Sequence, residues 1–384
     1  MAAVHQGYRS PGGPRSGRDP GRCQSRFAHL RDDCRNWLSV SMIKPRALRP
    51  GDKVAAISLS RGWPSVYPRA YQDGKRQLQE TFGVEVVESR HALADISWLA
   101  AHPEARAADL MEVLKDSSIQ GIISIGGDDS IRMLPFVDLS IIRENPKVFL
   151  GYSDSTITHF AFLKAGVTSF YGPSLMAGFD ENGALLPYMA DSVRQVFFSP
   201  APSAWIPPNS DGWTCASWDW ADEKRNEKRR KLQPCSGWKW LQGSRQHRGA
   251  LIGGCLEVVD WLRGTPFWPD LSVWRNSILF LETSEDQPSP TAVTHMLRAL
   301  AATGALREAR GILCGRPFGD EATFEAYDSV LLQVLAELGL SALPLVTRMD
   351  FGHTDPKFIL PIGVEAEIDC DGQRIQLLES PTVW

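Results

Sequence analysis

Three side chains that could together perform nucleophilic catalysis stand at special places in the chain, Ser153, Glu282 and His353. The apolar run 148–150 predicts a buried strand, and Gly151 and Tyr152 break it just before Ser153. A helix that starts at once would place the Ser153 hydroxyl beside free backbone N–H groups, where an oxyanion is stabilised. The simpler interpretation is that Ser153 and the residue after it only cap that helix.

Glu282 ends a second apolar run, residues 277–281, and His353 follows a glycine. A serine, a carboxylate and a histidine in one cleft would act as nucleophile, orienting acid and general base. The alternatives are that Glu282 is an acid at a helix start and that His353 is an ordinary turn histidine. Glu285 lies one helical turn after Glu282 and could face His353 instead. Because Glu282 stands at the end of a predicted strand, we favour Glu282 as the orienting acid.

Alternation of strands and helices predicts an α/β fold with a parallel sheet. In the first half, strands are expected at 54–60, 84–87, 121–125 and 148–150, and helices at 66–81 and 103–116. In such sheets ligands bind at the carboxyl ends of the strands. The turn Gly126-Gly127 and Ser153 both lie at such ends.

The second half repeats this alternation after a Trp-rich, charged stretch. Strands are expected at 249–256, 277–281 and 311–315, helices at 289–303 and 322–338, and a hairpin at 364–378 that turns at Asp371-Gly372. The sequence therefore predicts an N-terminal parallel-sheet domain with flanking helices, a smaller C-terminal α/β domain, and an active-site cleft between them. The expected boundaries are 42–200 for the nucleophile domain, 201–248 for a linker or substrate loop, and 249–384 for the domain carrying Glu282 and His353.

Residues 1–41 are rich in arginine, glycine, proline and serine, and bury too little apolar surface to fold. We expect a disordered extension, or a start annotated upstream of a true start at Met42. An organelle transit peptide is the other interpretation, since the segment contains arginine and serine but no glutamate.

Composition excludes several classes of function. A net charge of −4 argues against a nucleic acid polymer as partner, and no apolar run is long enough to cross a membrane. Seven scattered cysteines without metal-ligand spacing are typical of reduced thiols in a cytoplasmic protein. Neither a dinucleotide fingerprint nor a P-loop is present, so we expect no metal and no cofactor.

Six motifs, taken in order, resemble the LD-carboxypeptidase family of serine peptidases over residues 43–380. They are Leu48-Arg49-Pro50-Gly51-Asp52, Ile125-Gly126-Gly127-Asp128-Asp129-Ser130, Gly151-Tyr152-Ser153-Asp154, Gly253-Gly254-Cys255-Leu256, Phe280-Leu281-Glu282, and Phe351-Gly352-His353 with Leu360-Pro361-Ile362-Gly363. The Gly-Gly-Asp-Asp-Ser turn and the long Trp-rich segment are more similar to the microcin C immunity branch than to the murein-recycling branch.

The resemblance implies a cytoplasmic homodimer that removes a C-terminal residue with a Ser153–His353–Glu282 triad. It also implies that the backbone N–H groups of Gly127 and Asp154 form the oxyanion hole. Two residues depart from the family pattern: Cys255 stands where asparagine is usual, and Leu59 where proline is frequent. Neither belongs to the triad, so we expect activity to be kept while substrate contacts differ.

The substrate is expected to be a small peptide or a peptide–nucleotide conjugate. In the immunity branch an aromatic residue stacks on a nucleotide base, and Trp218 or Trp220, close to Glu223, could fill that place. The alternative is that these tryptophans pack the linker. The competing functions are a murein tetrapeptide LD-carboxypeptidase and a non-catalytic binding module on the same fold.

Overall fold

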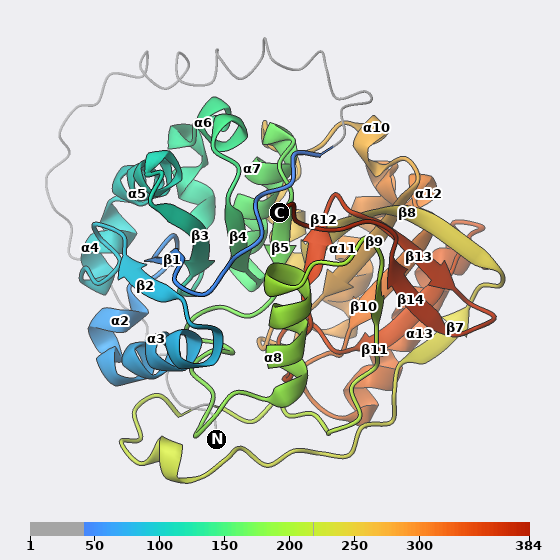
Figure 1. The fold of residues 1–384 in the computed structure, drawn as a ribbon. Helices are drawn as coiled ribbons and strands as arrows, with labels where there is room; N and C mark the ends of the chain where they lie inside the picture. The colour runs from blue at the N-terminus through green and yellow to red at the C-terminus, as the bar shows by residue number, and fades with distance from the viewer. Residues whose placement is uncertain (1–41, 218) are drawn as a thin grey trace, which may run out of the picture. The chain divides into compact units, whose positions relative to one another are not determined.

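The computed structural model describes residues 42–217 and 219–384, all within the compact unit Trp37–Trp384. The predictions for residues 1–41 and for Trp218 lie outside the described residues. The described chain forms two β-sheets, each flanked by helices (Figure 1). This confirms the predicted α/β architecture.

The first sheet has five parallel strands and one antiparallel edge strand. In spatial order they are β12 (Leu360–Ile362), β5 (Ser169–Tyr171), β4 (Val148–Gly151), β3 (Ile119–Ser124), β1 (Lys53–Ile57) and β2 (Glu85–Glu88). The strand predicted at 54–60 ends at Ile57, and the three residues after it leave the sheet as a loop. Strand β12 comes from the far end of the chain and closes the edge beside β5.

The second sheet has a parallel centre flanked on both sides by antiparallel strands. Its spatial order is β6 (Ala204–Ile206), β14 (Arg374–Leu377), β13 (Glu365–Asp369), β8 (Gln246–Cys255), β9 (Ser277–Glu282), β10 (Gly311–Gly315), β11 (Leu345–Met349) and β7 (Lys239–Gln242). Every residue of β9 is buried, as its continuous apolar run predicts for a central strand. The hairpin of β13 and β14 confirms the turn predicted at Asp371-Gly372.

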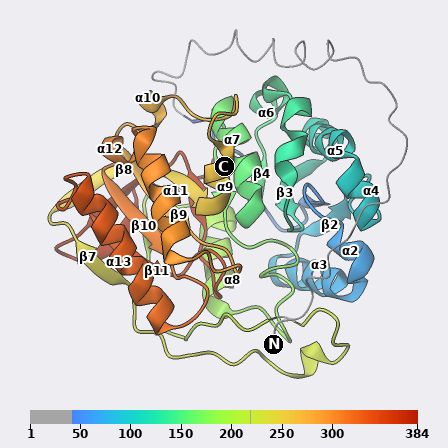
Figure 2. The ribbon, with the colours of Figure 1, turned by 180° about the vertical axis from the view of Figure 1, so that it is seen from behind.

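Helices cover the faces of both sheets. Beside the first sheet lie α2 (Trp63–Val66), α3 (Pro68–Phe82), α4 (Ile96–Ala101), α5 (Pro103–Lys115), α6 (Leu139–Glu144), α7 (Thr156–Ala165) and α8 (Pro187–Val193), which continues as a π-helical turn, Arg194–Phe198. With the second sheet lie α9 (Leu256–Leu262), α10 (Leu271–Trp274), α11 (Pro290–Ala302), α12 (Ala305–Glu308) and α13 (Glu321–Glu337). Figure 2 shows α11 and α13 side by side over one face of this sheet.

Side chains at the helix starts explain several boundaries. Asp95 accepts hydrogen bonds from the backbone N–H groups of Ser97 and Trp98, and Asp320 accepts one from Thr323. These side chains satisfy N–H groups that have no partner inside the helix, which fixes where α4 and α13 begin.

The chain between β6 and β7 is long and has little regular structure apart from the short 3-10 turn Arg225–Glu227. We call residues 207–238 the connecting loop. In Figure 1 it is the yellow-green trace that runs along the lower edge of the molecule, and Figure 2 shows the same course from behind. It carries Trp220 and Glu223, two of the predicted substrate residues.

No helix within residues 42–217 and 219–384 combines the length and the apolar character needed to cross a membrane.

Candidate active site

Ser153 stands at a sharp turn between a strand and a helix. Strand β4 ends at Gly151, and the 3-10 turn Ser153–Ser155 leads directly into α7. Ser153 has a φ of 59°, in the left-handed region that non-glycine residues rarely adopt. Such strained backbone is typical of functional positions, and here it places a serine between a strand end and a helix start. The strand–turn–helix predicted around Ser153 is confirmed.

His353 connects the other two predicted site residues. Its Nε2 lies 3.0 Å from Ser153 Oγ, and its Nδ1 lies 2.6 Å from Glu282 Oε2. Glu282 ends β9 and His353 lies in the loop after β11, so residues from both sheets meet at this point. Both side chains are buried, His353 with 6% and Glu282 with 3% of its surface exposed.

The charge of Glu282 decides the protonation of this histidine. Burial lowers the pKa of His353, but the charge and hydrogen bond of Glu282, together with the charge of Glu285, raise it to about 8. An imidazolium is therefore stabilised where a general base must take up a proton.

The two candidate acids contact different nitrogens of the His353 ring. Glu282 lies at Nδ1, whereas Glu285 Oε2 lies 3.0 Å from Nε2, on the side that also faces Ser153. The Glu285 side chain is 62% exposed, but that of Glu282 is fully buried. Because the orienting acid of a triad holds Nδ1, the geometry favours Glu282 for that role.

The glycine before His353 lets the Glu282 carboxylate come close. Gly352 has a φ of 95°, and a Cβ atom there would lie 2.7 Å from Glu282 Oε2. Any side chain at position 352 would displace the carboxylate that contacts His353. Steric crowding and the positive φ therefore require glycine just before His353.

Tyr171 is a site residue that the sequence reasoning missed. Its hydroxyl accepts a hydrogen bond from the backbone N–H of Ser153 at 3.0 Å and donates one to Glu282 Oε1. Tyr171 ends β5 and is fully buried. It therefore ties the backbone of the serine in the first sheet to the acid in the second. The only signal in the sequence is its position at a strand end before Gly172-Pro173.

His159 forms hydrogen bonds that hold the backbone just before the serine turn. It is fully buried in α7, with Nε2 2.9 Å from the Gly151 carbonyl oxygen and Nδ1 2.9 Å from Ser169 Oγ. Burial lowers the pKa of His159 to about 4, so it stays neutral. His159 therefore packs beneath the serine turn as a neutral, hydrogen-bonded histidine.

The predicted oxyanion donors follow two neighbouring strands. Gly127, after β3, has a φ of 123°, and a Cβ atom there would lie 2.7 Å from the backbone nitrogen of Arg61. The buried Asp154 side chain accepts hydrogen bonds from the Ser60 hydroxyl and the Ser130 N–H. Burial raises the pKa of Asp154 to about 6, although these hydrogen bonds oppose the shift. Asp154 thus fastens together the loops after β1, β3 and β4.

A pocket of 430 Å³ opens beside His353. Its walls include Tyr152 and Glu285 as well as Tyr67, Asp219 and Trp220. The Trp220 ring packs against Tyr67 at 5.5 Å and its Nε1 donates a hydrogen bond to Asp180 at 2.7 Å. Trp220 therefore packs the connecting loop, as one interpretation expected. It also lines the pocket, where the other interpretation would have it stack on a base.

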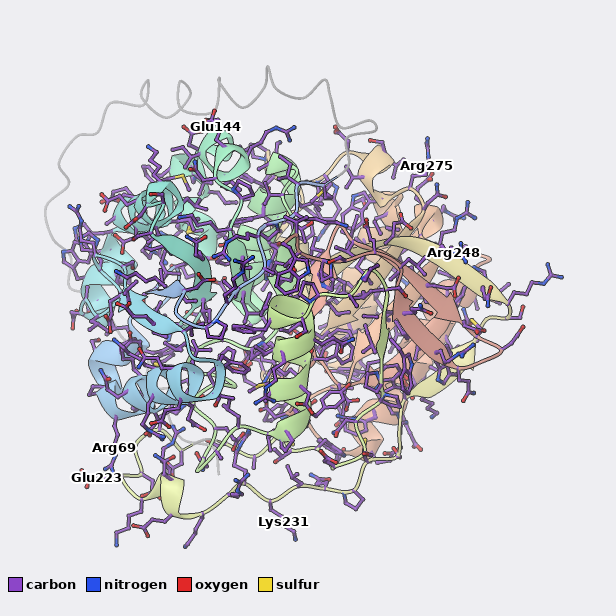
Figure 3. The ribbon with its side chains drawn as sticks, viewed as in Figure 1. Arg69, Glu144, Glu223, Lys231, Arg248 and Arg275 are labelled. Carbon is purple, nitrogen blue, oxygen red and sulfur yellow. The ribbon has the colours of Figure 1, made fainter. Side chains whose placement is uncertain are left out.

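The structure does not bring Glu223 to this pocket. The residue is exposed, and Figure 3 shows its side chain at the outer edge of the connecting loop. Trp218, the other predicted aromatic contact, lies outside the described residues.

Buried ion pairs hold the connecting loop in place. Arg225 pairs with Asp180, with side chains 1% and 0% exposed. Arg230 contacts both Glu181 and Asp355, again with buried side chains. Asp355 lies two residues after His353, so the loop is anchored to the first half of the chain and to the histidine segment.

Cys255, which replaces the expected asparagine, lies at the end of β8 beside Glu282. Its thiol is buried and contacts Glu257 Oε2 at 3.4 Å, while its N–H donates to Thr156 Oγ1. Burial raises the pKa of the thiol, so it stays protonated. In the described part of the chain, no cluster of histidine, cysteine and carboxylate residues could hold a metal ion.

Comparison with known proteins identifies both halves of the chain. Residues 54–172 match the LD-carboxypeptidase N-terminal domain, and residues 248–368 match the LD-carboxypeptidase C-terminal domain. These ranges contain Ser153, Glu282 and His353.

Two of the curated relatives are each 28% identical to this chain over the aligned residues. One is the microcin C7 self-immunity protein MccF of Escherichia coli, with 71% of this chain and 78% of that protein aligned. The other is a probable murein peptide carboxypeptidase of Bacillus subtilis, with 85% of this chain and 91% of that protein aligned.

Solved structures of MccF-like proteins share the fold. A MccF-like protein from Streptococcus pneumoniae in complex with AMP has a TM-score of 0.77 and 30% identity, over 85% of this chain and 98% of that chain. MccF in complex with aspartyl sulfamoyl adenosine has a TM-score of 0.77 and 26% identity, over 88% and 99%. The chain therefore belongs to the LD-carboxypeptidase family and is a carboxypeptidase with that family's two-domain architecture.

Proposed function

We propose that the protein is a serine carboxypeptidase in which Ser153 is the nucleophile, His353 the general base and Glu282 the orienting acid. The observation that carries the proposal is the continuous contact from Ser153 Oγ to His353 and on to Glu282, at 3.0 and 2.6 Å. A non-catalytic binding module would have no need of this arrangement, and a strained serine backbone would be a cost without a function.

In the acylation step, His353 Nε2 takes the Ser153 hydroxyl proton as Oγ attacks the scissile carbonyl carbon. The oxyanion that forms accepts hydrogen bonds from the N–H groups of Gly127 and Asp154, each of which contributes about 3 kcal/mol in comparable sites. Glu282 stabilises the imidazolium. His353 then donates the proton to the leaving nitrogen, the carbon–nitrogen bond breaks, and an ester on Ser153 remains.

Deacylation runs through the same groups. A water molecule gives a proton to His353 and attacks the ester, and the proton returns to Ser153 Oγ as the acid product leaves. Tyr171 holds the Glu282 carboxylate and the Ser153 backbone throughout. No metal or cofactor has a step in this scheme.

For the substrate we propose a peptide–nucleotide or aminoacyl–nucleotide conjugate. The Trp220 ring in the pocket wall offers a flat surface on which a base could stack. The AMP and aspartyl sulfamoyl adenosine complexes of the MccF-like structures support the same class. The second candidate is a murein tetrapeptide LD-carboxypeptidase, which the Bacillus subtilis relative favours. A cytoplasmic location and a homodimer remain predictions.

The test is a panel assay of the purified protein with LD-peptides and aminoacyl sulfamoyl adenosines. We expect hydrolysis of at least one adenosine conjugate, and its loss in Ser153→Ala while circular dichroism shows a folded protein. Preferential cleavage of a murein tetrapeptide would select the second candidate. Turnover that is unchanged in Ser153→Ala would remove the triad assignment.

A further inference from the structure

Glu285 occupies a position that the proposed chemistry does not use. Its Oε2 lies 3.0 Å from His353 Nε2, which is also the distance from that nitrogen to Ser153 Oγ. The carboxyl group therefore reaches the place where the proton moves between serine, histidine and leaving group. Its side chain is 62% exposed and lines the pocket, so it can also turn toward a ligand.

The contact between Glu285 and His353 suits only one protonation state of the ring. An ionised carboxylate accepts hydrogen bonds and cannot donate one, so Nε2 must carry a proton when Glu285 lies against it. A protonated Nε2 has no lone pair with which to take the Ser153 proton. Glu285 must therefore leave His353, or lose its charge, before the serine can attack.

The other charges in the pocket walls indicate which kind of ligand group could bind Glu285 and separate it from His353. The charged side chains of its walls, apart from His353, are the carboxylates Asp219 and Glu285, and the described wall residues include no lysine or arginine. Lys357 is fully buried behind the Tyr152 ring, where it pairs with Asp355. The charged wall residues beside His353 are therefore negative, which favours a cation and disfavours a second carboxylate at this place.

We propose that Glu285 is a specificity-determining residue that binds a primary ammonium group of the substrate next to the scissile bond. This inference rests on the proposed function and names its substrate class further. Pairing with the ammonium removes Glu285 from Nε2 and leaves His353 free to act as the base. The ammonium can be the free α-amino group of an aminoacyl substrate or the side-chain amine of a diamino acid.

Four sulfamoyl adenosine conjugates distinguish these two sources: lysyl, norleucyl, and the Nα-acetyl derivative of each. Norleucine keeps the length of the lysine side chain without its charge, and acetylation removes the α-amino charge. Their dissociation constants are measured by calorimetry in Ser153→Ala, which binds without turnover, and in the same protein carrying Glu285→Gln. Asp286→Asn is the matched control, because it removes a carboxylate from the next residue, which is exposed and does not line the pocket. Wild-type hydrolysis of each conjugate is followed in parallel.

We expect the conjugate with the recognised ammonium to bind about 2- to 5-fold tighter than its uncharged counterpart, as for a partly exposed ion pair. Glu285→Gln should abolish this preference and Asp286→Asn should keep it. Glu285→Asp, which keeps the charge, should retain part of it. Equal affinities for all four conjugates, no binding of any of them, or a preference that survives Glu285→Gln would overturn the inference. A Glu285-dependent binding preference without wild-type hydrolysis would support the inference and contradict the proposed function instead.

Discussion

Ser153 and Glu282 stand at strand ends, and His353 lines the pocket from a short loop after a strand, whereas Trp220 reaches the pocket from the long connecting loop. The first three are held by direct hydrogen bonds to one another and to Tyr171. The connecting loop is held instead by buried ion pairs to distant segments, such as Arg225 with Asp180. The catalytic side of the pocket is thus fixed by the sheets, and the binding side by charge pairs.

This difference separates the effects that substitutions should have. Removing a triad group leaves the sheets intact and should act on kcat. Breaking a buried ion pair leaves a charge without its partner, which costs folding free energy and releases the loop that carries Trp220. Substitutions in the loop should therefore act on stability and on KM. Four measurements can break or support this division.

Substitution His353→Ala should lower kcat by about 10⁴- to 10⁶-fold, because it removes the general base that takes the Ser153 proton. The melting temperature should also fall, because the buried Glu282 carboxylate loses His353, although it keeps the hydrogen bond from Tyr171. Steady-state kinetics and a thermal melt of the same preparation measure both. Activity within tenfold of the wild type would exclude His353 as the general base.

Substitution Arg225→Met should lower the free energy of unfolding by about 3 kcal/mol, because the fully buried Asp180 loses its cation. KM should rise, since Asp180 also holds the Trp220 indole, while kcat stays close to the wild-type value. Urea unfolding and substrate titration give both quantities. The control is Arg229→Met, an exposed arginine of the same loop that should be neutral. A normal KM in Arg225→Met would mean that the loop does not depend on this pair.

Substitution Tyr171→Phe should lower kcat about tenfold, because the Ser153 N–H and one Glu282 oxygen each lose a buried partner. The matched control is Tyr327→Phe, which removes a hydroxyl that donates to the Pro288 carbonyl. That variant should keep the wild-type kcat. Equal effects of the two substitutions would show that Tyr171 has no special part in the triad.

The pH dependence should follow the protonation of His353. Because the neutral ring is the base and its pKa is raised to about 8, kcat/KM should increase with pH and level off above about 8. Glu285→Gln removes a negative charge and should move this midpoint to lower pH. The raised pKa also adds stability below the ordinary value of 6.5, which is lost as the pH rises through about 8. A midpoint that is the same in both proteins would contradict the electrostatic role of Glu285.

The sequence predicted most of the strands and helices because their apolar patterns are local. Glycine turns and polar residues at strand ends likewise pointed to Ser153 and Glu282. Tyr171 was missed because its hydroxyl contacts two residues that are distant in the sequence, Ser153 and Glu282. A local sequence pattern gives no sign of such contacts. The pairing of Arg225 with Asp180 joins residues 45 positions apart and was equally out of reach. The addition of β12 to the first sheet depends on tertiary packing in the same way.

The proposed nucleophile is tested most directly by identifying the residue that reacts with a serine-directed electrophile. The protein is treated with a serine-directed fluorophosphonate, digested, and the modified peptide is identified by tandem mass spectrometry. We predict one adduct on Ser153, absent from Ser153→Ala and strongly reduced in His353→Ala. An adduct on another residue, or labelling of Ser153 that does not depend on His353, would contradict the proposed triad.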